Sequence, residues 1–439
     1  MEDKKKRSIW NLASWLEGDT VVWIIVMMLI LISIVCIFSS TSRLLEGDQT
    51  RIDIIRRQLK VVVAGVAVIL LCFSIKKEKI FKWFSKWGFI ASALMLVFLD
   101  MHDIIGAVGP VKPVKINEAW RIIQIGSIQI HIFEVIKVLM VMYLAWAMDT
   151  FRLKEFRWPN NRLGQKWLYI YGPFLFIFLF TIPGSNTAAL FIGAIMFITI
   201  LLGGGNVKDM LLLLVTGSLI LGACFGIYDM TKDSPNPKMV RIGTAMGRLF
   251  DDKDYETIYL DQSNSREERQ EAIDKIRQPY GAKIAIKEGG ILGKGPGQST
   301  QRYMVPDMAE DYMFSFIIEE YGLLGGILVI LLYVSLLARS SIIARNCGDD
   351  LYAKLVVAGL SLLITGQAFL HMFVNADIGP MTGQTLPMIS HGNSAFLCFS
   401  LAFGVLLSLS RTAAKNMEEA QRKAIPLMEI DDDIKNYGV

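Results

Sequence analysis

Repeated apolar runs of membrane-spanning length constrain this chain more than any other feature of its sequence. A transmembrane helix needs about 20 mainly apolar residues, and its backbone polar groups must be paired within the segment. Hydrophobic residues make up 53% of the 439 positions, and the mean hydropathy is +0.43, well above the usage of soluble proteins. We therefore predict an all-α polytopic membrane protein with about ten transmembrane helices. The expected spans are roughly 21–41, 58–75, 83–100, 131–149, 167–183, 187–203, 209–228, 312–338, 351–374 and 392–410.

Basic residues near the first run predict the orientation of the chain. Lys4, Lys5, Lys6 and Arg7 precede that run, and cytoplasmic segments are rich in Lys and Arg. With ten spans, both termini lie in the cytoplasm. We divide the chain into a cytoplasmic segment at 1–20, a membrane domain at 21–410 and a cytoplasmic tail at 411–439.

The same orientation places a large extracytoplasmic loop, residues 228–311, between the seventh and eighth spans. Its middle, 263–276 (SNSREERQEAIDKI), begins with residues that favour a helix N-cap and continues with helix-forming residues. Pro235, Pro237 and Pro279 are expected to break the flanks. A short surface helix is therefore predicted.

The end of this loop, residues 289–311, combines glycines with one cation and one carboxylate. Gly293 and Gly295 flank Lys294, and glycines allow a backbone to approach a ligand and to present N–H groups to phosphate oxygens. Asp311 stands where the loop meets the next apolar run. Glycines before a helix are also ordinary turn residues, and aspartate is a common helix N-cap. Both interpretations stay open on these residues alone.

Charges inside the apolar runs are a second signal, because each is costly in a bilayer unless it is paired or hydrated. Glu134 and Lys137 lie three apart in the fourth run, a spacing at which opposite charges meet on one helix face. The pair fits a functional role or a self-satisfied structural one.

Metal, disulfide and nucleic-acid signals are weak. The five cysteines are scattered, with four in apolar runs and Cys347 on the cytoplasmic side, so no disulfide framework or zinc motif is expected. A net charge of +4 gives no argument for nucleic-acid binding.

Three motifs in order resemble the SEDS family, whose members RodA and FtsW are peptidoglycan glycosyltransferases. The first covers 117–137, where Arg121, Glu134 and Lys137 match. The second is GGxxGxGxxxS at 289–299, followed by Pro306, Asp311, Phe314, Glu319, Glu320 and Gly322. The third is P-x-T-G-x-x-L-P-x-I-S-x-G-x-S at 380–394, with Ser390 inside it and Gln367 also fitting. The chain departs from the family pattern at Glu118, Ile122, His131, Ile132, Phe133, His371, Asp377, His391 and Asn393.

The resemblance implies an enzyme of the bacterial cytoplasmic membrane that polymerises lipid II on its outer face, with Asp311 as general base. It implies that the growing glycan is held on undecaprenyl pyrophosphate, and Lys137, Arg248 and Lys294 are our candidates to offset the charge of that pyrophosphate. The full set of candidate substrate-binding residues is Arg121, Glu134, Lys137, Arg248, Gly293, Lys294, Gly295, Glu320, Gln367 and Ser390. A divalent cation would share the task, although the sequence shows no dedicated ligand set.

The resemblance also implies a class B penicillin-binding transpeptidase as partner, with other division or elongation proteins of the membrane. The length, the short acidic tail and the SNTA turn at 185–188 are more similar to FtsW than to RodA, which favours division over elongation.

Two other classes of function remain. A lipid II flippase or other transporter also has many spans with buried charges, but the chain has no detectable inverted repeat and its carboxylate stands at a loop–helix junction. A purely structural scaffold for division proteins would not need Asp311.

Overall fold

The computed structural model describes residues 18–40, 51–101, 111–116, 119–126, 128–231, 255–305, 307–379 and 382–437. Within these residues, helical segments occupy all of the predicted apolar runs, which confirms the helical polytopic class. They are α2 (Thr20–Ser40), α3 (Arg51–Ser74), α4 (Glu78–Asp100), α6 (Ile132–Arg152), α7 to α8 (Arg162–Thr181, with a π-helical turn at Trp167–Tyr171), α9 (Asn186–Leu202), α10 (Val207–Thr231), α14 (Met313–Asn346), α15 (Leu351–Asn375) and α16 (Asn393–Tyr437).

Seven helices of the described chain are long and apolar enough to cross a membrane. They lie at Thr20–Ser40, Arg56–Ser74, Glu78–Asp100, Arg162–Thr181, Met313–Asn346, Leu351–Asn375 and Asn393–Lys415, and α9 is a shorter apolar helix. The protein is therefore a multi-pass membrane protein. The number of ten crossings stays a prediction.

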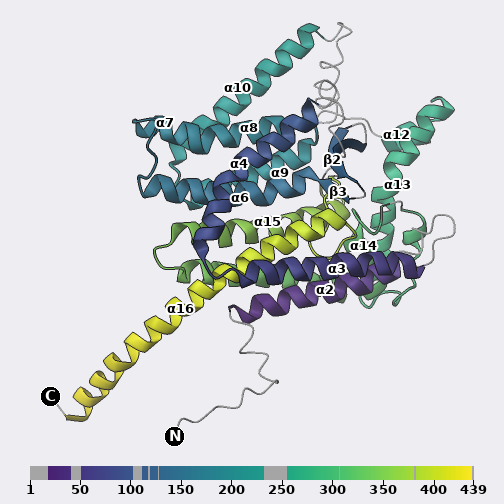
Figure 1. Cartoon of the computed structure of the whole chain (residues 1–439). Coiled ribbons are helices and arrows are strands. Elements are labelled where there is room, and N and C mark those ends of the chain that lie inside the picture. The colour runs from purple at the N-terminus through teal and green to yellow at the C-terminus, as the bar shows by residue number, and fades with distance from the viewer. Residues whose placement is uncertain are drawn as a thin grey trace.

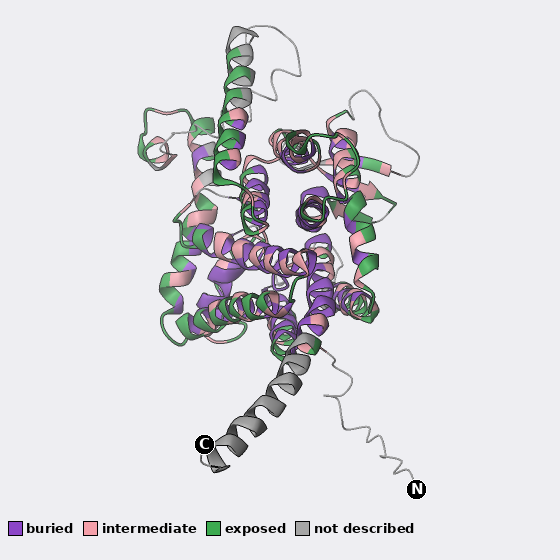
Figure 2. Ribbon diagram, turned by 90° about the vertical axis from the view of Figure 1, so that its left-hand side faces the viewer, coloured by how far each residue is buried: buried purple, intermediate pink, exposed green. Residues whose placement is uncertain are grey.

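Close helix packing depends on small residues at the contacts. α3 runs along α16 and α14 runs along α15, as Figure 1 shows. A Cβ at Gly65 of α3 would lie 2.4 Å from the Phe396 ring, and one at Gly404 of α16 would lie 2.7 Å from Cys72 Cβ. Small residues allow helix backbones to approach in a membrane, where there is little hydrophobic force between helices. Buried residues fill the centre of the bundle, while α10 leaves the bundle and is exposed along much of its length (Figure 2).

A small antiparallel sheet precedes α6. It has the order β1-β2-β3, with β1 at Val111–Ile116, β2 at Ala119–Ile125 and β3 at Ile128–His131. The strands are rich in Val and Ile and bury Ile122 and Ile123, and β3 continues directly into α6. No strand was predicted here, since such short segments give no signal of membrane length. The sheet places Arg121 and His131 at the start of α6.

The large loop contains two further α-helices among its described residues, α12 (Tyr255–Leu260) and α13 (Arg266–Gly289), and a short 3-10 helix at Gln301–Tyr303. α13 begins with a capping box in which Ser265 Oγ accepts from Glu268 N–H and the Glu268 carboxylate accepts from Ser265 N–H. The serine cap was predicted correctly, but the break at Pro279 was wrong. The helix continues through Pro279 because α13 packs against α14 and buries Ala282 and Ala285 beyond it.

Candidate active site

Asp311 ends a tight turn that leads into α14. Its N–H donates to Asp307 O at 2.9 Å, and a methyl group placed on Gly383 would lie 3.5 Å from Asp311 Oδ2. The carboxylate therefore faces the loop at 382–391. It accepts no hydrogen bond from the residues that the structure describes.

The N-terminus of α14 is capped by α15 and not by Asp311. Tyr312 is the N-cap residue and its side chain makes no capping bond. The Ser315 N–H donates to Asn375 Oδ1 at 2.9 Å, and Asn375 Nδ2 donates to Asp311 O at 3.0 Å. The capping interpretation of Asp311, left open above, thus has no support in the geometry of its side chain.

The surroundings of Asp311 favour its protonated form. Burial, followed by the negative charges of Glu310 and Asp307, raises the pKa of the Asp311 carboxyl from 3.8 to about 7, while Arg121 acts in the opposite direction. A group with a pKa near the working pH can both accept and release a proton during turnover. Asp311 is therefore suited to act as a general base.

Lys137 is the centre of a buried polar network beside this loop. Its ammonium group donates to Glu134 Oε1 at 2.6 Å, to Gln367 Oε1 at 2.5 Å and to Gln384 Oε1 at 2.9 Å. Only 2% of Lys137 is exposed. The predicted Glu134–Lys137 pair therefore forms, and it joins α6 to α15 and to the loop that faces Asp311.

Ser390 and His391 connect the loop at 382–391 to the Asp311 turn. Ser390 Oγ donates to Glu310 O at 2.7 Å, and His391 N–H donates to Ala309 O at 2.9 Å. His391 Nδ1 also lies 3.2 Å from Glu310 Oε1. Ser390 is thus placed at the turn that positions the carboxylate.

Arg121 approaches the same region from the sheet. Its Nε donates to Gly184 O at 3.0 Å, in the short turn between α8 and α9, and its positive charge acts on the pKa of Asp311. His131 lies beside it at the end of β3, and burial lowers the pKa of His131. The structure therefore places the charge of Arg121 near Asp311 and Ser390 at the Asp311 turn. Glu134, Lys137 and Gln367 form one network, which reaches the loop that faces Asp311 through Gln384.

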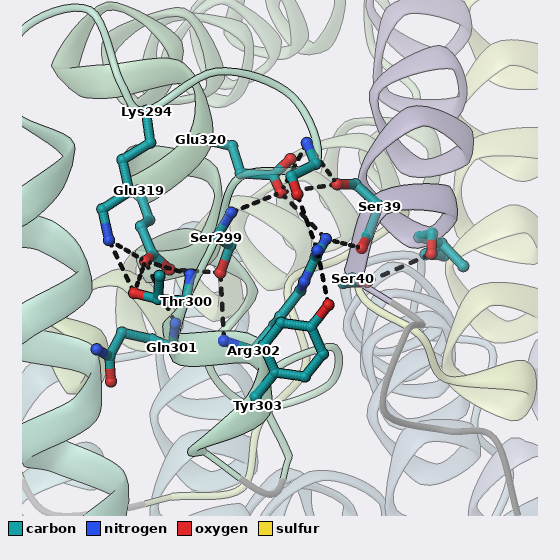
Figure 3. Close-up of polar contacts among 12 residues, drawn as sticks. Ser39, Ser40, Lys294, Ser299, Thr300, Gln301, Arg302, Tyr303, Glu319 and Glu320 are labelled. Carbon is teal, nitrogen blue, oxygen red and sulfur yellow. Dashed lines mark hydrogen bonds and ion pairs between the residues drawn. The ribbon is translucent and has the colours of Figure 1, made fainter.

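The remaining described candidates form a second cluster, shown in Figure 3. Lys294 Nζ donates to Glu319 Oε1 at 2.7 Å and also pairs with Glu288. Glu320 Oε1 accepts from Ser39 Oγ at 2.7 Å and from Gly297 N–H at 3.1 Å. Glu319 and Glu320 are both fully buried on α14.

The glycine loop lies directly against the backbone of α14. The helix is interrupted at Gly322, whose angles are φ 70° and ψ −174°, and Lys294 N–H donates to Glu319 O at 2.8 Å beside this break. A Cβ at Gly293 would lie 2.2 Å from Glu320 O, and one at Gly322 would lie 2.1 Å from Ile291 O. The glycines here permit contact between two stretches of backbone.

Some amide groups of this loop donate to buried carboxylates of α14. The Thr300 N–H donates to Glu319 Oε1 at 2.8 Å, and the Gly297 N–H donates to Glu320 Oε1 at 3.1 Å. The N–H groups of Lys294 and Gly295 donate instead to the backbone carbonyls of Glu319 and Glu320. Of Gly293, Lys294 and Gly295, only Lys294 contacts a carboxylate of α14, and it does so through its ammonium group. The phosphate-binding interpretation of the three residues stays a prediction. Arg248, the last candidate, lies outside the described residues.

The described residues also bear on metal binding. Over the part of the chain that the structure describes, no group of three or more His, Cys, Asp or Glu side chains is arranged to hold a metal ion.

Comparison with known proteins identifies the family. Residues 19–415 match the FtsW/RodA/SpoVE family model, described as cell cycle protein. The chain belongs to this family. The probable peptidoglycan glycosyltransferase FtsW of Coxiella burnetii is 28% identical over 345 residues, which are 76% of this chain and 80% of that protein.

Two solved structures share the fold of this FtsW/RodA/SpoVE member. One is described as "Structural coordination of polymerization and crosslinking by a peptidoglycan synthase complex", with a TM-score of 0.63 and 17% identity over 91% of this chain and 99% of that chain. The other is the Thermus thermophilus rod shape determining protein RodA, with a TM-score of 0.58 and 18% identity over 91% and 98%. At these identities the likeness concerns the fold.

Several residues of this FtsW/RodA/SpoVE site were missed in the sequence. Gln384 binds Lys137, and Asn375 holds the start of α14. Gly383, which faces Asp311, was identified only as a glycine of the third motif. Gln384 occupies a variable position of the third motif, so the motif did not identify it as a site residue. Asn375 lies four residues after His371 on one face of α15, and that spacing of two polar residues in an apolar run was the signal available.

Proposed function

We propose that this protein polymerises lipid II into glycan strands on the outer face of the bacterial cytoplasmic membrane, in cell division. The observation that supports it most is the half-buried Asp311 carboxyl with a pKa of about 7, held against the third motif and beside the Lys137 network. The relatives named peptidoglycan glycosyltransferase FtsW support the same reaction and the division role.

In this proposal Asp311 takes the proton from the acceptor sugar hydroxyl. The hydroxyl oxygen then forms a bond to the anomeric carbon of the donor glycan, and the bond from that carbon to undecaprenyl pyrophosphate breaks. The proton stays on Asp311 until the product leaves and the carboxyl returns it to solvent. A base with a pKa near 7 is deprotonated in a large fraction of molecules at neutral pH and still has useful proton affinity.

The departing pyrophosphate needs positive charge. Among the described cations, Arg121 acts on Asp311 and Lys137 lies behind the loop that faces it, so we place these two nearest the reaction. Lys294 is paired with Glu288 and Glu319, and much of its charge is already offset. We assign Lys294 to holding the glycine loop.

Reconstitution tests the activity directly. Purified protein in vesicles, with fluorescent lipid II accessible only from the outer face, is expected to give glycan polymers on a gel. A flippase would move lipid II across the bilayer and make no polymer, and that result would contradict the proposal.

The same assay tests the partner. We propose that a class B penicillin-binding transpeptidase binds this protein in the membrane. The structural similarity to a chain of a peptidoglycan synthase complex supports this pairing. We also propose that both termini of the present chain lie in the cytoplasm. Adding such a transpeptidase is expected to raise the polymerisation rate, and the two proteins should copurify in mild detergent. Equal rates and separate elution would argue against the partner while leaving the polymerase reaction intact.

The pH dependence of the rate follows from Asp311. Because its pKa is raised to about 7, the carboxyl gains a proton as the pH falls through that value, and only the deprotonated form is a base. We expect kcat/KM to fall about tenfold per pH unit well below pH 7 and to level off above it. Initial rates between pH 5 and 9 on folded protein check this. A rate that stays constant down to pH 5 would exclude Asp311 as the titrating base.

A further inference from the structure

His371 joins the two segments that meet at Asp311. It is fully buried on α15. Its Nε2 accepts from the Phe314 N–H at 3.3 Å, in the first turn of α14. Its Nδ1 lies 2.7 Å from Gln384 O, in the loop whose Gly383 faces the Asp311 carboxylate. One ring therefore contacts both sides of the candidate site.

The partners of His371 determine its tautomer. A backbone N–H is always a donor, so Nε2 carries a lone pair in this arrangement. The proton then resides on Nδ1, which donates to Gln384 O. The ring is a neutral linker with one donor and one acceptor, each used once.

The two bonds have different consequences. The bond from Phe314 N–H satisfies one of the four N–H groups that the start of any helix leaves unpaired. The bond to Gln384 O fixes a residue whose side chain binds Lys137 at 2.9 Å and whose neighbour Gly383 adjoins Asp311. The second bond thus sets the position of the base relative to the Lys137 network.

We propose that His371 is a positioning residue for the polymerisation reaction, and that it acts through its Nδ1 bond to Gln384 O. This inference rests on the proposed function, since it concerns where Asp311 lies relative to the groups around it. The Nε2 bond to Phe314 contributes stability to α14 and has little effect on the rate.

Two substitutions separate the bonds. The side-chain amide of asparagine lies near the place of Nδ1, and that of glutamine near the place of Nε2. His371→Asn keeps a donor for Gln384 O and loses the acceptor for Phe314, whereas His371→Gln keeps the acceptor and loses the donor. Both variants stay polar and neutral, so each is the control for the other.

We expect His371→Asn to have a lower Tm and a kcat within about threefold of the unsubstituted protein, since a lost capping bond affects stability. We expect His371→Gln to have the higher Tm of the two and a kcat lowered about tenfold or more, with KM little changed, because small misplacements of a reacting group are costly. The acid limb of its pH profile should also move to lower pH. Burial is the largest cause of the raised pKa of Asp311, and a released loop admits water.

Polymerisation by the unsubstituted protein is measured first, so a failure of the proposed function is seen separately. Given that activity, equal kcat values and equal pH profiles in the two variants would overturn the inference. The inference would also be overturned if, in both variants, the loss of kcat were in proportion to the loss of Tm, because that pattern is expected of a purely structural residue. If His371→Gln is not recovered folded, a folded His371→Asn with kcat reduced more than tenfold overturns it, and near-normal kcat supports it.

Discussion

Asp311→Asn is expected to give a folded protein that binds lipid II and makes almost no glycan. The amide has nearly the size of the carboxylate but does not accept the proton, so the polymerisation rate should fall roughly a hundredfold or more. The stability change should be small, because α14 is capped by Asn375 and His371 and not by the Asp311 side chain. Glycan synthesis from fluorescent lipid II, assayed with the transpeptidase present, measures the rate.

An exposed carboxylate, Asp377, provides the control. Asp377 follows the end of α15 and is ion-paired with Lys283. Asp377→Asn should leave the rate within about twofold, as expected of a surface substitution. Near-normal polymerisation by Asp311→Asn would remove Asp311 from the mechanism and move attention to Glu134 or Glu320. Loss of lipid II binding in that variant would show that the carboxylate acts in binding and not as a base.

The helices were predictable because a bilayer fixes their length and composition. The runs at 21–41 and 351–374 correspond to α2 (Thr20–Ser40) and α15 (Leu351–Asn375) to within a residue at each end. The strands of the sheet that precedes α6 gave no comparable signal. Pro279 was misjudged because contact of α13 with α14 outweighs the local preference of proline.

The site was predictable where a contact lies within one helix. Glu134 and Lys137 have a spacing that brings their charges together, and their atoms are 2.6 Å apart. The other partners of Lys137 come from residues 367 and 384, more than 200 positions later, and no spacing rule relates such distant positions. In the sequence, His371 was noted only as a departure from the family pattern. Its two hydrogen bonds depend on contact between α15, the first turn of α14 and the loop at 382–391.

The glycine loop shows a different limit of sequence reasoning. Glycines and amide groups at 289–297 predict close approach of the backbone to another group, but the sequence does not reveal which group. Here the Gly297 N–H donates to the buried carboxylate of Glu320, whereas the N–H groups of Lys294 and Gly295 donate to backbone carbonyls of α14. The loop and the broken helix therefore form one unit, and its stability depends on backbone contact at Gly293.

Gly293→Ala is therefore expected to damage the fold more than substitution of a neighbouring glycine. Gly293 has φ +81°, and an added methyl would lie 2.2 Å from Glu320 O. The obstacle is backbone, so the loop must move and lose the bonds from Lys294 N–H to Glu319 O and from Gly295 N–H to Glu320 O. We expect a large fall in Tm and a low yield of folded protein.

Gly297→Ala isolates the conformational part of that effect. Gly297 has φ +78°, almost the same as Gly293, but a methyl there meets nothing within 4 Å. A left-handed conformation costs an L-residue about 1–2 kcal/mol, and this cost applies to both variants. The difference in Tm between the two, measured in one detergent, therefore reports the collision with Glu320 O alone. Equal Tm values would mean that the loop does not press on α14 at Gly293, and the close contact inferred from the glycines would then be wrong.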